Sequence, residues 1–159
     1  MVAYSLVGSR LDYANLVLFG TSAKNVTHLH RIQSTLARII TMQRGRISIS
    51  KTLSDLHWLP MKFFVDFKVV TLTFKVLECG EPGYLYSRIG IATSHRTLRS
   101  SADTRKLSVI PSRTKISARA FRHSAPQVWN SLPLNIRSTS SIQSFKSRLK
   151  THYFRQAFN

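Results

Sequence analysis

The side chains of this sequence that are best suited to chemistry are its cations. The chain of 159 residues has 24 Lys and Arg and only six Asp and Glu, a formal net charge of +18. Positions 88–159 hold fourteen of the basic residues against one acidic residue, a net +13. Such an excess attracts polyanions, and charge alone does not choose between RNA, DNA and an anionic membrane. The candidate phosphate-binding residues are Arg96, Arg99, Arg105, Lys106, Arg113, Lys115, Arg119, Arg122, Lys146 and Lys150.

The remaining polar side chains offer little for catalysis. Metal-dependent reactions need clustered carboxylates, or His and Cys at ligand spacing. The six acidic residues are scattered, and His28 and His30 are two positions apart, so on a helix they point in different directions. His57, beside Trp58, is expected to cap or pack. With no phosphate-cradling glycine loop and no nucleophile elbow, the sequence predicts a protein that is not an enzyme and holds no metal or cofactor.

The cysteine content and the length of the apolar runs indicate in which cellular compartment the protein is expected. Cys79 is the only cysteine, so no disulfide forms within the chain, and a reducing compartment inside the cell, nucleus or cytoplasm, is expected. Cys79 itself is expected to be a small buried residue near a helix end. The longest apolar runs, such as residues 16–19, are far shorter than the about 18 residues that span a bilayer. We expect neither a secretory signal nor a membrane partner.

The elements that must position the cations are predicted to be helices in the first half of the chain. Apolar residues recur at helical spacing over 2–19 and over 22–42, where Ser22 is the expected N-cap. A short helical segment follows at 51–56. Pro60 suits the start of the best helix, 61–78, and Gly80 and its neighbours end it.

Helix 61–78 is expected to form the core. Phe63, Phe67, Val70, Phe74 and Leu77 are spaced 4, 3, 4 and 3 positions apart, which indicates one continuous apolar stripe.

The second half of the chain mixes loops and helices. Residues 90–117 read as a basic, loop-rich connector, with a strand-like run at 107–110 and the option of a small hairpin. Regular structure is expected again over 116–131, and an amphipathic helix over 141–157. Lys146 and Lys150 are one helical turn apart there, so they can meet successive phosphates.

Large aromatic side chains are the expected anchors of this basic surface. Residues 123–138, HSAPQVWNSLPLNIRS, contain a tryptophan but no acidic residue. A mobile basic tail would not need such an anchor, so the neighbouring arginines are expected to be presented from a fixed surface. The predicted structural anchors are Trp58, Phe67, Trp129 and Phe145.

Five blocks of the sequence resemble one known family. Together, and in this order, they are similar to the carboxy-terminal region of the replicase polyprotein of non-LTR (LINE-type) retrotransposons of the jockey and chicken-repeat kind. The resemblance covers nearly the whole chain. The blocks are SRLDYAN (9–15), LHWLPMKFFVDFKVVTLTFKVL (56–77), RTLRSS (96–101), RAFRHSAPQVWNSLPLNIRS (119–138) and SFKSRLKTHYFRQAF (144–158).

The resemblance implies an organisation in three segments. Residues 1–43 resemble the helical thumb that grips the template–primer duplex, 44–89 would form a helical core segment, and 90–159 a basic carboxy-terminal region with a connector and helices. The palm's catalytic Tyr-x-Asp-Asp sequence and the endonuclease carboxylates do not occur in the chain, so polymerisation is not implied. Met1 would lie inside a continuous polyprotein, which indicates translation from an internal start.

Three functional hypotheses follow. The leading hypothesis is a non-catalytic fragment that binds RNA and DNA through electrostatics with little sequence preference. The second is a thumb piece that restores RNA-directed DNA polymerase activity in trans with the palm domain of a separate reverse transcriptase. The third is a degenerate copy of an element with no selected function.

Overall fold

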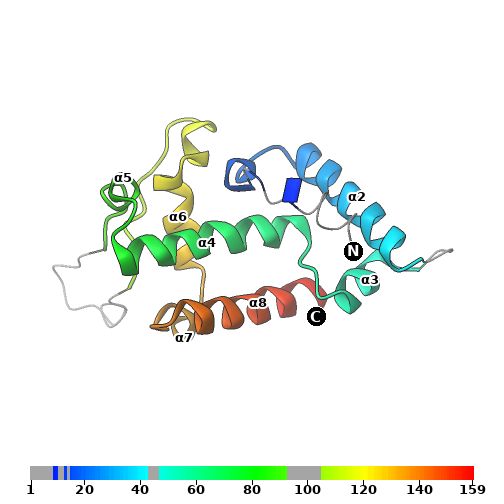
Figure 1. The fold of residues 1–159 in the computed structure, drawn as a ribbon. Helices are drawn as coiled ribbons and strands as arrows, with labels where there is room; N and C mark the ends of the chain where they lie inside the picture. Colours follow the sequence, from blue (N-terminus) through cyan, green and yellow to red (C-terminus); the bar gives the residue numbers. More distant parts are fainter. Residues whose placement is uncertain (1–8, 11–12, 14, 43–46, 93–104) are drawn as a thin grey trace. The chain divides into compact units, whose positions relative to one another are not determined.

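The computed structural model describes residues 9–10, 13, 15–42, 47–92 and 105–159, and Figure 1 shows their helices in order. Throughout these ranges the regular elements are helices, so the predicted mainly α fold is confirmed. Extended pairing in the same ranges is limited to one isolated bridge. The elements are η1 (Asn15–Leu18), α2 (Ala23–Ile40), α3 (Ile49–Asp55), α4 (Met61–Cys79), α5 (Gly83–Tyr86), η3 (Ser117–Arg119), α6 (Phe121–Asn130), α7 (Leu134–Arg137) and α8 (Ile142–Phe158).

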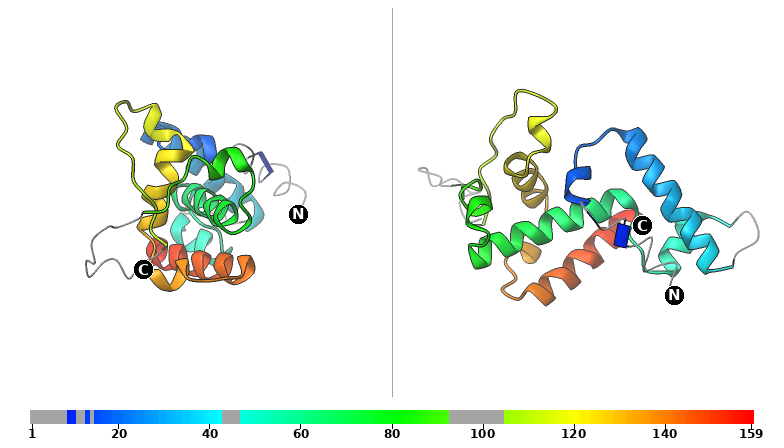
Figure 2. Two further views of the ribbon diagram at one scale, coloured as in Figure 1. Left: turned by 90° about the vertical axis from the view of Figure 1, so that its left-hand side faces the viewer. Right: turned by 45° about the horizontal axis from the view of Figure 1, so that its top comes forward.

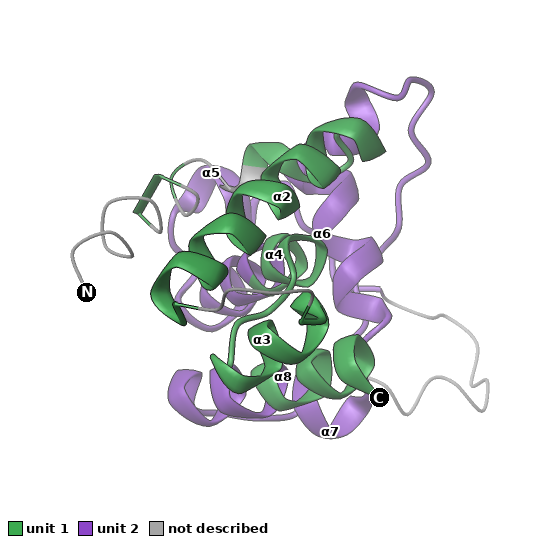
Figure 3. Cartoon of the chain, turned by 90° about the vertical axis from the view of Figure 1, so that its right-hand side faces the viewer, with its two compact units in different colours: residues 1–67, 150–159 green, residues 68–149 purple. Residues whose placement is uncertain are grey.

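The chain divides into two compact units, which Figure 3 shows in two colours. The first unit contains residues 1–67 and 150–159, and the second unit contains residues 68–149. Both boundaries of the units fall inside long helices, α4 and α8. The three segments predicted from the sequence end at positions 43 and 89 and therefore do not coincide with the units. Glycine, proline and charge mark turns along a chain, whereas the units follow from the packing of its helices.

Helix α2 of the first unit begins and ends close to its predicted limits. Ser22 has extended backbone angles, and its side-chain oxygen accepts a hydrogen bond from the Asn25 backbone N–H at 3.4 Å. This side chain satisfies one of the donors that every helix leaves unpaired at its amino terminus. Leu36 and Ala37 are buried, and α2 packs against α3. The predicted helix over 2–19 lies mostly outside the described residues, and its described end is the short η1.

The turn after α3 is built around a non-glycine residue in the left-handed region. His57 has φ of 55°. Its backbone N–H donates to the Ser54 carbonyl at 2.9 Å, and the Trp58 N–H donates to the Leu53 carbonyl at 2.9 Å. These two bonds are those of a Schellman motif, which usually places glycine at this position. The His57 ring stacks on Phe154 with centroids 5.8 Å apart, so His57 both caps and packs, as expected.

Helix α4 begins after Pro60 and ends before Gly80, as predicted. Gly80 has φ of 68° and donates its N–H to the Val76 carbonyl at 3.0 Å, which ends the helix. The predicted single stripe was too narrow. Buried residues occupy a wider arc of the helix than that stripe, because neighbours cover α4 on more than one side. They include Met61, Val65, Val69, Val70, Phe74 and Val76, whereas Phe63, Phe67 and Leu77 of the stripe are only half-buried.

Cys79 is exposed, which corrects the prediction of a buried thiol. It is the last residue of α4, and its neighbour Glu78 is exposed as well. The helix therefore extends beyond its covered part before Gly80 turns the chain. The short helix α5 follows this turn.

Aromatic rings form the centre of the second unit. Phe145 of α8 stacks on Phe74 of α4 with centroids 4.1 Å apart, and on Trp129 of α6 with centroids 5.8 Å apart. Both views in Figure 2 show the second half of α4 next to the first half of α8. Trp129 is 1% exposed and Phe145 is 0% exposed. These two predicted anchors are confirmed as core residues.

The connector returns to the core at one short pairing. Ile91 and Leu107 form an antiparallel bridge. The Ala92 N–H donates to the Lys106 carbonyl at 2.9 Å, and the Ser108 N–H donates to the Gly90 carbonyl at 2.8 Å. The predicted strand-like run at 107–110 is thus reduced to this bridge in the described residues.

Candidate nucleic-acid interface

Two consecutive side chains of α6 hold the end of the connector. The Trp129 indole Nε1 donates to the Arg105 carbonyl at 2.7 Å. The Asn130 side chain accepts from the Leu107 N–H at 2.9 Å and donates to the Leu107 carbonyl at 2.8 Å. The backbone that leads to the basic residues after position 110 is therefore fixed to the core of the second unit.

Arg105 makes contacts inside the second unit. Its Nη1 lies 2.9 Å from Glu78 Oε1 and donates to the carbonyl oxygens of Arg137 at 3.0 Å and Thr139 at 3.5 Å. A guanidinium nitrogen with these partners joins α4 to the backbone around the end of α7. The sequence singled out Arg105 for phosphate binding, and in the structure one of its guanidinium nitrogens makes these contacts within the chain.

Arg137 is an internal cation that the sequence reasoning missed. It is 4% exposed, and its Nε donates to the Leu132 carbonyl at 3.0 Å. In the sequence it stands in a run of polar residues and looks like a surface arginine. The only sequence signal is its place directly after Ile136, which is also buried.

Three of the predicted phosphate-binding residues lie together on one turn. We call residues 113–119 the basic turn. Two hydrogen bonds of 3.1 Å join Ser117 to Thr114, from the Ser117 N–H to Thr114 Oγ1 and from the Ser117 hydroxyl to the Thr114 carbonyl. The Ala118 N–H also donates to the Thr114 carbonyl at 3.1 Å. The cations of the basic turn, Arg113, Lys115 and Arg119, are all exposed.

The remaining predicted cations are placed differently. Lys106 and Arg122 are half-buried, and the Nε of Arg122 is buried without a hydrogen-bond partner. Lys146 and Lys150 are exposed on α8, but Lys146 belongs to the second unit and Lys150 to the first. Arg96 and Arg99 lie outside the described residues, so the structure does not place them.

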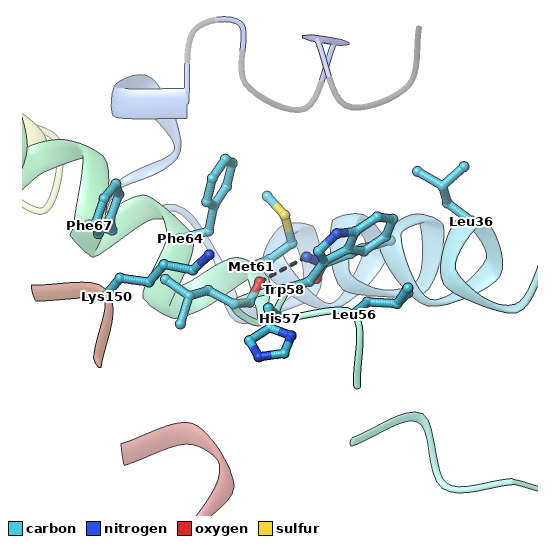
Figure 4. A pocket seen from close by; sticks show the side chains of 10 residues that line it. Leu36, Leu56, His57, Trp58, Met61, Phe64, Phe67 and Lys150 are labelled. Atoms are coloured by element: carbon cyan, nitrogen blue, oxygen red, sulfur yellow. Dashed lines mark hydrogen bonds between the residues drawn. The ribbon is translucent and has the colours of Figure 1, made fainter. Parts of the chain in front are cut away.

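The first unit contains a pocket that the sequence reasoning did not anticipate. Its volume is about 410 Å³. The turn at His57 brings Trp58 into it, beside Phe64 and Phe67 from the first turns of α4, and Figure 4 shows Lys150 of α8 extending toward Phe64. Trp58 and Phe67, which the sequence predicted as structural anchors, are half-buried and line this pocket. The other lining residues are Gln33, Leu36, Leu56, His57, Leu59 and Met61.

Gln33 on α2 is the polar group of this pocket that is most enclosed. It is 7% exposed, and its Nε2 donates to the Leu59 carbonyl at 2.8 Å, a bond drawn in Figure 4. This bond fixes the orientation of the amide, because the carbonyl needs a donor. The Oε1 of Gln33 is buried without a hydrogen-bond partner.

A carboxyl group and a phenol lie close together elsewhere in the first unit. Burial raises the pKa of Asp66 from 3.8 to about 6, and the nearby Lys62 ammonium opposes this increase. Burial and the negative charge of Asp66 raise the pKa of Tyr153 well above its usual range. The Tyr153 hydroxyl is buried without a hydrogen-bond partner, and its ring lies 5.8 Å from that of Phe63.

Neither a metal cluster nor a membrane span is found in the part of the chain that the structure describes. No three His, Cys, Asp or Glu side chains of these residues come together as metal ligands. None of the helices in the same ranges is both long and apolar enough to cross a bilayer.

Comparison with known proteins identifies no family model, curated protein or solved structure that matches this chain.

Proposed function

We propose that the chain is a non-catalytic fragment of a non-LTR retrotransposon reverse transcriptase that binds the RNA and DNA backbone electrostatically, with little sequence preference. The main observation that supports this proposal is the basic turn. Arg113, Lys115 and Arg119 are exposed within seven residues on a hydrogen-bonded turn, and no carboxylate follows Asp103 in the sequence. Cations with this placement neutralise phosphates and release counterions, which is a sequence-independent source of affinity.

The attachment of the turn supports the same function. The segment before it is bonded to Trp129 and Asn130 of α6, and the His123 ring Nδ1 lies 2.9 Å from the Ile110 carbonyl oxygen. The cations are therefore presented from an ordered backbone, which lowers the entropy lost when phosphates bind.

The test is the salt dependence of binding to duplex DNA. If about five phosphates are engaged, log K falls with log salt at a slope of about −4.5, and replacing Arg113, Lys115 and Arg119 by Gln reduces that slope by about 2.7. The matched control replaces Lys24, Arg31 and Lys51, three exposed cations of the first unit, by Gln. A slope near zero for the unchanged protein rejects the function. Equal losses in both triple variants reject the basic turn as the binding surface.

A second candidate function is a thumb piece that acts with a separate palm. The observation that favours it is the outer side of α2, where Ile39 is 62% exposed and Ile32 and Ile40 are also exposed. Exposed apolar side chains on a helix are typical of a surface that packs against a partner. The experiment is primer extension on an RNA template with a palm fragment alone and with both pieces mixed. Extension only in the mixture supports this function, whereas equal extension in the two reactions rejects it.

A further inference from the structure

The pocket of the first unit has the dimensions and side chains of a ligand site. Its about 410 Å³ lies within the range of about 300–1,000 Å³ typical of small-molecule sites. Trp58, Phe64 and Phe67 give it aromatic walls, so a flat apolar group fits it best. Aromatic side chains of this kind are the usual stacking partners of unpaired bases.

Gln33 adds a requirement for a hydrogen-bond donor. Its Nε2 is already bonded to the Leu59 carbonyl, so only Oε1, a buried acceptor without a partner, remains for a ligand. A buried acceptor without a partner is costly, and a ligand N–H removes that cost. Because Oε1 is covered by its neighbours, the lining side chains must move slightly when the ligand enters, as side chains commonly do on binding.

Lys150 adds a requirement for negative charge. It lines the pocket and is exposed to solvent, so its ammonium can contact an anion just outside the apolar part. An aliphatic side chain of a partner protein would fill the cavity but would use neither Gln33 nor Lys150. A fatty acid would reach Lys150 but offers no N–H. A nucleotide supplies all three features, since each base has a flat ring and an N–H group and is linked to a phosphate.

We propose that this pocket binds one unpaired base of single-stranded RNA or DNA, with its N–H at Gln33 Oε1 and its phosphate at Lys150. This inference rests on the proposed nucleic-acid binding and adds to it a site in the first unit that senses whether bases are stacked in a duplex. The protein is thereby directed to single-stranded segments, while the basic turn of the second unit binds any phosphate backbone.

The test compares two ten-nucleotide strands of equal charge with the full-length chain. One is single-stranded DNA, and the other has the same backbone with an abasic site at every position. The base-bearing strand is expected to bind about 5- to 150-fold more tightly, the range for stacking of one base. Equal affinity for both strands, with steep salt dependence, overturns the base pocket and leaves the proposed function intact. Binding of neither strand rejects the proposed function itself.

Two pairs of variants locate the effect of the bases. Phe64→Leu is expected to remove most of the preference for the base-bearing strand, whereas Tyr84→Leu, at a ring that is 71% exposed and outside the pocket, keeps it. Lys150→Gln reduces the preference for the base-bearing strand, whereas Lys146→Gln weakens the binding of both strands equally. Thermal unfolding confirms that each variant is folded. Retention of the full preference in folded Phe64→Leu and Lys150→Gln proteins would show that the bases stack elsewhere.

Discussion

Asn130 pairs with the backbone of Leu107 through both groups of its side-chain amide. Its oxygen accepts from the Leu107 N–H at 2.9 Å, and its nitrogen donates to the Leu107 carbonyl at 2.8 Å. A helix side chain thus takes the place of a neighbouring strand for one residue of the connector. Trp129, the residue before it, bonds to the Arg105 carbonyl. The two residues together fix the path of the chain toward the basic turn.

Replacing Asn130 by Asp tests this pairing. The carboxylate still accepts from the Leu107 N–H, but it cannot donate to the Leu107 carbonyl and repels it. Because Leu107 is buried, we expect the free energy of unfolding to fall by about 1–3 kcal/mol, measured by urea denaturation. Asn159→Asp, at the exposed end of the chain, introduces the same charge and is the control. Equal stability of the two variants would contradict the role of the amide.

Arg105 is expected to contribute to stability, whereas Arg113 is expected to contribute to phosphate binding. Arg105→Gln removes the contacts with Glu78 and the Arg137 carbonyl, so we expect a loss of about 1–2 kcal/mol in the free energy of unfolding and little change in the salt slope. Arg113→Gln should leave stability within about 0.5 kcal/mol and reduce the slope by about 0.9. Urea denaturation and DNA titration on both variants check this. The opposite assignment would make Arg105 the phosphate-binding residue.

The helices could be predicted because their limits are set locally. Ser22 and Pro60 mark the starts of α2 and α4, and Gly80 marks the end of α4, through backbone preferences that the sequence displays directly. The burial of Trp129 and Phe145 agrees with their size and apolarity. Size does not fix the degree of burial, since Trp58 and Phe67 are only half-buried.

The roles of the individual cations could not be predicted in the same way. Arg105 reaches Glu78, 27 positions away, and the Arg137 carbonyl, 32 positions away. No local pattern distinguishes it from Arg113, which is exposed. The pocket was missed for a related reason. It depends on the left-handed backbone of His57, a conformation that sequence preferences assign to glycine or asparagine.

Arg137 is expected to contribute more to the free energy of unfolding than an exposed arginine of a neighbouring helix does. Arg137→Ala removes the bond to the Leu132 carbonyl and leaves a cavity where the buried side chain lay. We expect a loss of about 2–4 kcal/mol in the free energy of unfolding. Arg148→Ala is the matched control, since Arg148 is exposed and bonds to the Asn135 carbonyl at 3.0 Å; it should cost under about 1 kcal/mol. A smaller loss for Arg137→Ala than for Arg148→Ala would contradict this placement.

Asp66 makes the stability of the protein depend on pH. Its pKa is about 6 in the folded chain against the ordinary 3.8, so the folded state holds the proton more tightly and stability falls as the pH rises from about 4 to 6. Above about pH 6 the penalty for the buried charge is complete, and the Lys62 ammonium offsets only part of it. The Asp66 charge in turn raises the pKa of the nearby Tyr153 phenol.

Asp66→Asn removes this penalty, so the variant should be more stable than the unchanged protein at pH 8, by about 1–2 kcal/mol once solvent screening at this partly exposed position is allowed for. The difference should shrink between pH 6 and 4 and vanish below, because the carboxyl is then neutral in both the folded and unfolded states. Urea denaturation from pH 3.5 to 8 measures it. Asp55→Asn, at an exposed carboxyl, is the control. A stability difference that grows toward low pH would mean that the Asp66 charge stabilises the fold.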